Sequence, residues 1–518
     1  MMRTKFVVAL LLLSRFSFAQ NIPADATASW CRTGLSGTAR TAGSGGAYGS
    51  VGADMGGISI NPAGLGLYRS TDFSITPLVQ IGNNEGIYDG SHTFVHKPAF
   101  FLAQGGFEFS KLYKKKGDDN AEPVLRAFSF ALNFQQQGIF TRSQTYGATN
   151  TNKSLIDGYV DLMNYYHQPA TSFAPEVQIA SLTNLIGQNI NGGSYFSNVK
   201  APVLQHGDIE TRGGINRIDA AFGFNLLDKL YLGVDLAVPI LGYSVSSTIS
   251  ETPTSPQTNQ IQDYSMNTVI SESGYGFNGI IGLIYRPFPW MRVGAAYHLP
   301  TWYAIHEDYT LNFSEDTAVY NVSGPANLPT FQYGFRTPMK GVFSASFYYK
   351  QFGFISVDYE LQNLGAQRIH VPNDSLNYQT YYNDGMKSTY TYTHTIHAGV
   401  EAAIKIVRLR AGYSFSSSPY KSGQQVTAGY NDVRNAISAG IGVRLKHFYA
   451  DVAYVYGWSK DATVQMSNYN YPVNSIYNSS TILLTVGWKF EAGGKNTTQQ
   501  KTQQRRYTPP PVDTDQRY

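Results

Sequence analysis

The chain has 518 residues, of which 14% are charged and 14% are aromatic, and its formal net charge is +4. Soluble globular chains carry about 25% charged residues, and so small a net charge gives no basic footprint for nucleic acid. One cysteine excludes a disulfide framework, and a mean hydropathy of -0.24 without a long apolar run after the N-terminus argues against a helical membrane protein.

Residues 1–19 are predicted to be a secretory signal peptide. Arg3 and Lys5 precede the short apolar run 6–13, and small residues ending at Ala19 form a cleavage site. A run this short does not span a membrane as a helix, so an N-terminal anchor is the less favoured alternative. Cys31 lies well past the cleavage site, which argues against a lipid anchor on it. The sequence therefore predicts an exported protein.

Residues 20–66 are dense in glycine, alanine and serine. No Gly-Lys-Ser/Thr follows the glycine-rich run 43–49, and the glycine spacing does not match the dinucleotide-binding fingerprint. A nucleotide site is therefore disfavoured. Small residues suit a segment that packs closely against other backbone, so we expect a small N-terminal hatch inside a barrel.

Residues 67–490 show the period-two alternation of β-strands. In the last segment Ile482, Leu484 and Val486 alternate with Thr481 and Thr485. A soluble β-sandwich alternates in the same way, so alternation alone does not decide the class. We expect about fourteen strands, beginning near residues 68, 97, 126, 207, 230, 266, 290, 331, 352, 388, 407, 432, 447 and 479.

The lengths of the connections decide between the two classes. Very short links near 227–229, 286–289, 350–351, 405–406 and 446–447 alternate with long links at 247–266, 314–331, 369–388 and 466–479. Short turns on one side, long loops on the other and an even strand number are typical of an outer-membrane barrel. The fold class is therefore all-β: a transmembrane antiparallel barrel of about 14 strands.

This topology places both termini on the short-turn, periplasmic side, in the outer membrane of a Gram-negative (two-membrane) bacterium. One longer periplasmic turn carries Lys114, Lys115 and Lys116, which we interpret as a solvated basic turn. The polar, glutamine- and proline-rich residues 491–518 are expected to be a disordered periplasmic tail. A periplasmic or secretion partner for this tail is an open alternative.

The link 142–206 is the longest connection, and it is predicted to be a partly helical extracellular loop. Apolar residues recur there at helical spacing in two runs. The helices are expected either to pack together and cap the barrel or to form a groove for an apolar ligand, and the two roles are compatible. The candidate groove residues are Leu155, Tyr159, Leu162, Met163, Ile179, Leu182, Leu185 and Ile186.

Signals for catalysis or metal binding are weak. The chain has neither a Gly-x-Ser-x-Gly elbow nor a His-Glu-x-x-His motif, and a strand would send His394 and His397 to opposite faces. We expect no enzyme activity, no metal site and no cofactor. Polar residues on the inward faces are expected to pair and brace the lumen; the candidates are Asp235, Arg292, His298, Asp358, Glu360 and Glu401.

Residues 59–65, Ser-Ile-Asn-Pro-Ala-Gly-Leu, resemble the Asn-Pro-Ala element of FadL/TodX-type outer-membrane transport proteins. Segments 230–234, 282–287, 292–298, 335–338 and 354–360 are also similar to barrel segments of that family. The resemblance implies a fourteen-stranded barrel plugged by a hatch, to which Asn61, Pro62 and Ala63 would belong. Some members of the family are labelled haemin receptors, which the histidine pattern here does not support.

The resemblance also implies a function. The barrel would take up long-chain fatty acids or other hydrophobic small molecules passively, without ATP or TonB, through an outer groove, a lumen pocket and a hatch rearrangement. Its surroundings would be outer-membrane lipid and lipopolysaccharide, with the barrel-assembly machinery as a partner during biogenesis. The alternative is a FadL-like barrel that serves protein secretion or surface attachment. A general polar porin is disfavoured because residues 20–66 would obstruct its lumen.

Overall fold

The computed structural model describes residues 24–491, except for residues 33, 114–122, 151, 190–192, 256–260, 318–320, 328–329, 373, 375–376 and 464–471. The predicted signal peptide, the three lysines of the longer turn and the polar tail lie outside the described residues. In the described part of the chain, no helix is both long and apolar enough to cross a membrane.

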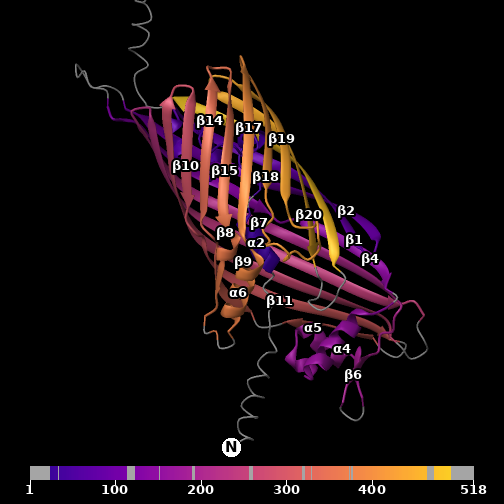
Figure 1. Ribbon diagram of the computed structural model, residues 1–518. Coiled ribbons are helices and arrows are strands. Elements are labelled where there is room, and N and C mark those ends of the chain that lie inside the picture. The colour runs from indigo at the N-terminus through magenta and orange to yellow at the C-terminus, as the bar shows by residue number, and fades with distance from the viewer. Residues whose placement is uncertain are drawn as a thin grey trace, which may run out of the picture.

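The strands form one closed antiparallel barrel with fourteen wall positions, as predicted. Closure comes from the ladder between the first and last strands, which runs from Ser70–Glu491 to Ile87–Asn474. Every wall strand has a neighbour on each side over at least part of its length, which limits the free edge that the sheet exposes to lipid. Figure 1 shows the resulting tilted wall.

Around the barrel the order is β1 (Ser70–Tyr88), β2 (Ser91–Leu112), β3 (Leu125–Ile139) continued by β4 (Arg142–Asn150), β7 (Val203–Leu226), β8 (Leu230–Pro253), β9 (Ile261–Phe288), β10 (Met291–His298) continued by β11 (Trp302–Thr317), β14 (Lys340–Tyr349) preceded by β13 (Phe331–Arg336), β15 (Gly353–Asn363) continued by β16 (Arg368–His370), β17 (Tyr392–Ile404), β18 (Val407–Ser416), β19 (Arg434–Arg444), β20 (Phe448–Thr463) and β21 (Val473–Glu491). Strand β12 (Asn321–Asn327) extends the β11 hairpin, and β5 (Ile186–Gln188) pairs with β6 (Tyr195–Ser197) in the long loop.

The predicted alternation of short and long connections is present with one exception: the link between β1 and β2, at the long-loop end, has only two residues, Asp89 and Gly90. Leu227 and Asp228, between β7 and β8, both have positive φ, as tight mirror-image hairpin turns require. At the opposite end, the long loops carry α4 (Leu155–Tyr166), α5 (Pro175–Leu182) and α6 (Tyr378–Thr389). Figure 1 places these three helices at one end of the barrel.

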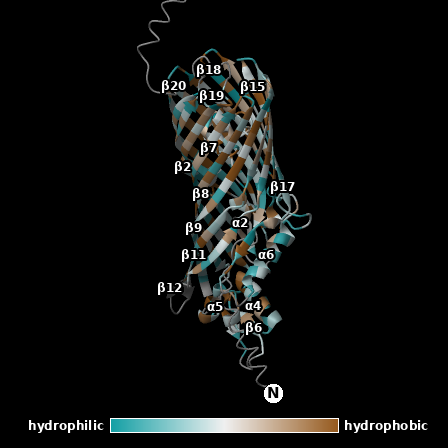
Figure 2. Ribbon diagram, turned by 90° about the vertical axis from the view of Figure 1, so that its left-hand side faces the viewer, coloured by the Kyte–Doolittle hydropathy of each residue, from teal (hydrophilic) through white to brown (hydrophobic). Residues whose placement is uncertain are grey.

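An apolar band surrounds the outside of the barrel. On β8 the outward residues from Leu232 to Ile240 are all apolar and exposed, and above them the outward positions become Ser244, Ser246 and Thr248. Eight steps of about 3.3 Å give a band about 26 Å long along the strand, which fits a tilted membrane crossing. The brown stripes along the strands in Figure 2 follow this alternation.

Aromatic rings mark the short-turn edge of the band. Trp290 stacks on Phe288 with ring centroids 5.2 Å apart and on Phe347 with centroids 6.3 Å apart. All three side chains are exposed. Aromatic girdles of this kind border the lipid-facing band of outer-membrane barrels.

The N-terminal segment runs lengthwise through the barrel. Thr27 in its first helix contacts Met386 of α6 at the long-loop end, whereas Ala63 packs with Tyr231 and Ile284 at the short-turn end. Strands β1 and β21 have their terminal ends on the short-turn side, as expected, but the described chain begins at the opposite end. The segment contains α2 (Ala24–Cys31), α3 (Ala39–Gly43), η2 (Met55–Gly57) and η3 (Pro62–Leu67).

We predict that Leu236→Arg lowers the free energy of unfolding from lipid bilayers by about 2–4 kcal/mol, because it places a charge at the middle of the band. Leu204→Arg is the matched control: Leu204 is 50% exposed and Leu236 46%, but Leu204 lies near the long-loop end of β7, beside the exposed polar residues His206 and Asp208. Denaturant titration in vesicles measures both. Equal losses for the two variants would contradict the placement of the band.

Candidate functional site

The Asn-Pro-Ala element attaches the short-turn end of the hatch to the wall. The Asn61 side chain accepts a hydrogen bond from Ala63 N at 3.1 Å and so caps the 3-10 helix η3. Its Nδ2 donates to Gly49 O at 2.6 Å and to Leu283 O of β9 at 3.2 Å. One buried amide therefore joins two turns of the hatch to a wall strand. Pro62 occupies the first helical position, where its missing N–H costs nothing.

Glycines on the inner face of the wall let the hatch backbone approach closely. A Cβ on Gly282 would lie 2.0 Å from Asn61 Oδ1, and a Cβ on Gly233 would lie 2.2 Å from Ala63 N. A Cβ within 3.0 Å of a neighbouring atom forces that atom to move; at Gly233 the atom is main-chain, and at Gly282 it is the Asn61 side chain that holds the hatch, so glycine at both wall positions favours the observed packing. We call the set that contacts the hatch in this way the glycine belt; it comprises Gly223, Gly233, Gly282, Gly294, Gly399 and Gly412.

The glycine belt reaches the other side of the lumen as well. A Cβ on Gly412 of β18 would lie 2.1 Å from Gly45 N, and one on Gly399 of β17 would lie 2.2 Å from Ser44 O. The belt was missed by sequence reasoning. Its signal in the sequence is glycine at inward-facing positions of several strands, but only the three-dimensional structure shows that these positions lie against one segment.

Two predicted lumen residues hold the middle of the hatch. Asp358 Oδ2 accepts a hydrogen bond from Gly49 N at 2.7 Å, and Arg292 Nη1 donates to Val51 O at 2.7 Å. Both bonds end on main-chain atoms of the hatch. These side chains therefore position the hatch in addition to bracing the wall.

His298 and Glu401 act in the same way. His298 Nε2 lies 3.0 Å from Ile60 O, and Glu401 accepts from Arg40 Nε of the hatch at 3.1 Å and from Arg410 Nε of the wall at 2.7 Å. An imidazole and a carboxylate used to bind the hatch are unavailable as ligands for a solute while the hatch is in place.

The remaining two predicted residues brace the wall. Asp235 is buried and pairs with the guanidinium of Arg217, which also pairs with Asp219. Glu360 accepts from Lys340 Nζ at 3.1 Å. Among the residues that the structure describes, no group of three His, Cys, Asp or Glu side chains is placed to hold a metal ion.

An aromatic core fills the long-loop end of the lumen, around the first helix of the hatch. Trp30 of α2 is 3% exposed and makes edge-to-face contacts with Tyr243 and Phe335, at centroid distances of 5.7 and 5.5 Å. We define the aromatic core by its buried members, which are Ala28, Trp30, Cys31, Ile215, Leu241, Tyr303, Ile305, Tyr333, Phe335, Leu364, Ile369, Val371, Met386 and Tyr390. Side chains from α2, the wall and α6 thus pack together and fill one apolar region of the lumen.

Cys31 lies at the edge of the aromatic core. Its Sγ is 3.8 Å from Oε1 of Gln367, which belongs to the wall segment between β15 and β16. Burial raises the pKa of the Cys31 thiol, so the group stays protonated and is a poor nucleophile.

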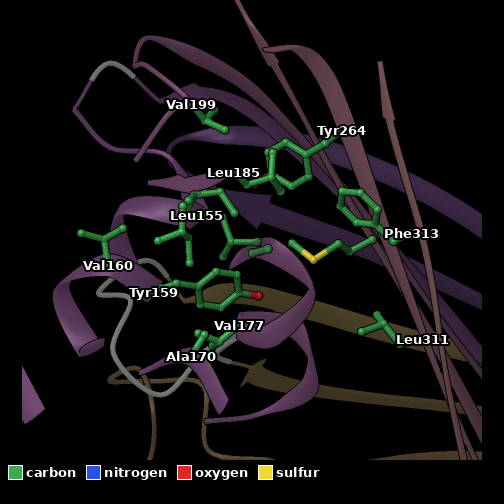
Figure 3. Packing of buried hydrophobic residues seen from close by; sticks show 14 of the residues in the cluster. Leu155, Tyr159, Val160, Ala170, Val177, Leu185, Val199, Tyr264, Leu311 and Phe313 are labelled. Atoms are coloured by element: carbon green, nitrogen blue, oxygen red, sulfur yellow. The ribbon is translucent and has the colours of Figure 1, made fainter. Parts of the chain in front are cut away.

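The extracellular helices pack onto the wall more tightly than a free groove would require. Of the predicted groove residues, Leu155, Tyr159, Met163, Leu185 and Ile186 are buried in one cluster with Tyr264, Leu311 and Phe313 of the wall (Figure 3). A capping box between Ser154 and Asp157 begins α4. Among the other predicted groove residues, Leu162 and Ile179 are half-buried and Leu182 is 82% exposed.

The wall is interrupted between β2 and β3. Their ladder runs from Leu112–Ala127 to Gln104–Gln135, and among the described residues the part of β2 from Ser91 to Ala103 has ladder partners on β1 alone. The hatch contacts the inner side of the wall next to this interruption, where Ser36 Oγ donates to Gln136 O.

No protein-family model matches the chain, and no curated protein sequence matches it. Among solved structures it is similar to the crystal structure of the toluene transporter TodX of P. putida, with 12% identity, a TM-score of 0.51 and coverage of 88% of this chain and 100% of that chain. It is also similar to a Pseudomonas aeruginosa FadL homologue, with 11% identity, a TM-score of 0.53 and coverage of 89% and 99%. The chain therefore has the FadL/TodX-type outer-membrane barrel fold.

We predict that Gly282→Val displaces the hatch without unfolding the barrel, because its Cβ would overlap the Asn61 amide. Hydrogen exchange of residues 43–66 should accelerate by about tenfold, which corresponds to a loss of about 1.4 kcal/mol of local stability. Gly242→Val is the control, since nothing lies within 4 Å of a Cβ there. Unchanged protection of the hatch in Gly282→Val would show that the glycine belt does not hold it.

Proposed function

We propose that the chain is an outer-membrane channel for the passive uptake of hydrophobic small molecules, independent of ATP and TonB. The observation that carries this proposal is the aromatic core: an apolar volume inside the lumen of a barrel whose outside is also apolar. Burial of a hydrocarbon contributes about 0.8 kcal/mol of binding free energy per CH₂. Such a volume would therefore attract hydrophobic solutes across the polar outer surface of the cell. The fold shared with TodX and the FadL homologue supports the same class of solute.

The filled lumen argues against a general polar porin. The hatch contacts the wall on both sides through the glycine belt. Its first helix places the buried Trp30 in the lumen nearer the long-loop end. Solute passage therefore requires part of the N-terminal segment to move. The alternative role in secretion or surface attachment rests on the family resemblance and on a possible partner for the tail, of which residues 492–518 lie outside the described residues.

The proposed path has three stages. A solute first contacts the apolar surface left on the loop helices, where Leu182 and Tyr165 are 82% and 78% exposed. It then takes the place of Trp30 in the aromatic core. It leaves either past the hatch or sideways at the unpaired part of β2, next to which Ser36 contacts the wall from inside.

Uptake into cells that lack their own channel for hydrophobic solutes tests this function. Expression of the protein should raise the uptake of labelled toluene and of a long-chain fatty acid several-fold over an empty vector. A protonophore should leave the increase unchanged, and glucose should not enter faster. Faster glucose uptake, or no increase for any solute, would contradict the proposal.

Trp30→Ala should convert the aromatic core into a binding cavity, because an apolar cavity of this size stays dry and accepts benzene-sized molecules. Calorimetry on the purified barrel should detect one bound toluene per chain in the variant, with at least tenfold higher affinity than in the wild-type protein. Trp458→Ala removes the same side chain from an outward position of β20 and serves as control. Equal toluene affinity in all three proteins would disprove the assignment of Trp30 as the residue that fills the cavity.

A further inference from the structure

Two glutamates face each other on the inner wall beside the aromatic core. Glu272 of β9 and Glu307 of β11 are direct partners in the antiparallel ladder, and directly opposed side chains have Cβ atoms about 4.5–5.5 Å apart. The exposed fractions of the two residues are 2% and 0%. We call them the carboxylate pair. They lie on the long-loop side of Tyr275. From that point towards the long loops, the outward-facing residues of β9 are no longer apolar.

The carboxylate pair lacks the partners that buried carboxylates need. Glu272 Oε1 accepts a hydrogen bond from the Tyr333 hydroxyl at 2.6 Å. In the described part of the chain, Glu272 Oε2 and both oxygens of Glu307 have no hydrogen-bond partner. No Lys, Arg or His among the described residues forms an ion pair with either glutamate.

Two other buried carboxylates of this protein are fully satisfied. Glu401 is paired with two arginines, as described above. Glu251, which has no arginine, accepts hydrogen bonds from Gln205 Nε2 at 2.6 Å, the Tyr264 hydroxyl at 2.7 Å and Leu155 N at 2.6 Å. These two carboxylates are satisfied by cations or by several neutral donors, and the carboxylate pair has neither.

The surroundings of the carboxylate pair are apolar. The inward-facing ladder neighbours one step nearer the membrane are Leu241 and Ile305, and those one step further out are Val245, Ile270 and Tyr309. Two carboxylates side by side in such a place are costly, because each loses its hydration and like charges repel. A position with a purely structural role would hold an apolar residue more stably, which points to a ligand that supplies the missing charge and donors.

We propose that the carboxylate pair binds the ammonium group of an amphipathic amine whose aromatic or hydrocarbon body lies in the aromatic core. An ammonium has three N–H donors, which match the three carboxylate oxygens that lack a partner. Phe331 and Tyr333, with ring centroids 5.5 Å apart, supply aromatic faces next to the charge, and such faces attract ammonium groups. This inference rests on the proposed function, since it selects one class of hydrophobic solute for that channel.

Divalent metal ions fit the carboxylate pair less well. Calcium takes six to eight oxygen ligands, and the described residues contain no group of three metal-ligating acidic, histidine or cysteine side chains. A fatty acid fits worse than an amine or a metal ion, because its own carboxylate would lie against two like charges. The inference therefore separates amines from the long-chain fatty acids that the family resemblance implies.

Three probes of nearly equal size test the inference: benzylammonium, benzyl alcohol and benzoate. Calorimetry on the full-length barrel should give at least tenfold tighter binding of benzylammonium than of benzyl alcohol, and the weakest binding for benzoate. In Glu307→Gln and Glu272→Gln, benzylammonium should fall to the affinity of benzyl alcohol, whose own affinity stays constant. Asp308→Asn, which changes the adjacent outward-facing carboxylate, should behave as the wild-type protein.

The outcomes separate the inference from the proposed function. Benzyl alcohol bound with no preference for benzylammonium overturns the ammonium site and leaves the hydrophobic channel intact. No binding of any probe, together with failed toluene uptake, overturns both. Calcium that binds the wild-type protein and is lost in both glutamine variants assigns the carboxylate pair to a metal and also overturns the inference. Heat-modifiable migration on gels verifies that each variant is a folded barrel.

Discussion

The lumen of this barrel is closed by direct contact between two backbones. The hatch lies so close to the wall that wall positions such as Gly233, Gly282 and Gly412 have no room for a Cβ, and this closeness determines most of the other features. It explains the density of small residues in the hatch, which sequence composition had already indicated. It also explains why the polar inner side chains bind main-chain atoms of the hatch. Under the proposed function, solute passes through such a barrel only when the hatch moves.

Charge in the lumen is divided between two levels. At the hatch, Glu401 is matched by two cations, Arg40 and Arg410. Beside the aromatic core, the carboxylate pair has no cation among the described residues. Matched charges stabilise the closed state, since breaking a buried pair leaves an uncompensated charge. Unmatched charges instead favour a solute that brings its own positive group.

The sequence predicted the barrel well because its signals are local. Side-chain parity identifies each strand, and short links such as the one at Leu227 and Asp228 determine the direction of the next strand. The path of α2 along the lumen was not predicted, because it depends on Trp30 meeting Tyr243 and Phe335 from distant strands. The burial of five predicted groove residues also depends on the wall against which the loop helices pack.

The carboxylate pair could not be recognised from the sequence for a related reason. Between the two glutamates the chain passes through a short turn and the break that separates β10 from β11, and the length of β10 does not determine the register beyond that break. Each glutamate taken singly fits an ordinary polar position on an inward face. Only the β9–β11 ladder shows that they are neighbours without a cation.

Cross-linking the N-terminal segment to the wall tests the central claim most directly, namely that this segment must move for solute to pass. In Gln367→Cys the new thiol replaces a side chain whose Oε1 lies 3.8 Å from Cys31 Sγ, and the oxidising periplasm can join the two thiols while the chain folds, before burial makes Cys31 unreactive. We predict that toluene uptake stops in the oxidised variant and returns on reduction, while the wild-type protein is unaffected by either treatment. Full uptake through a completely cross-linked barrel would contradict the account.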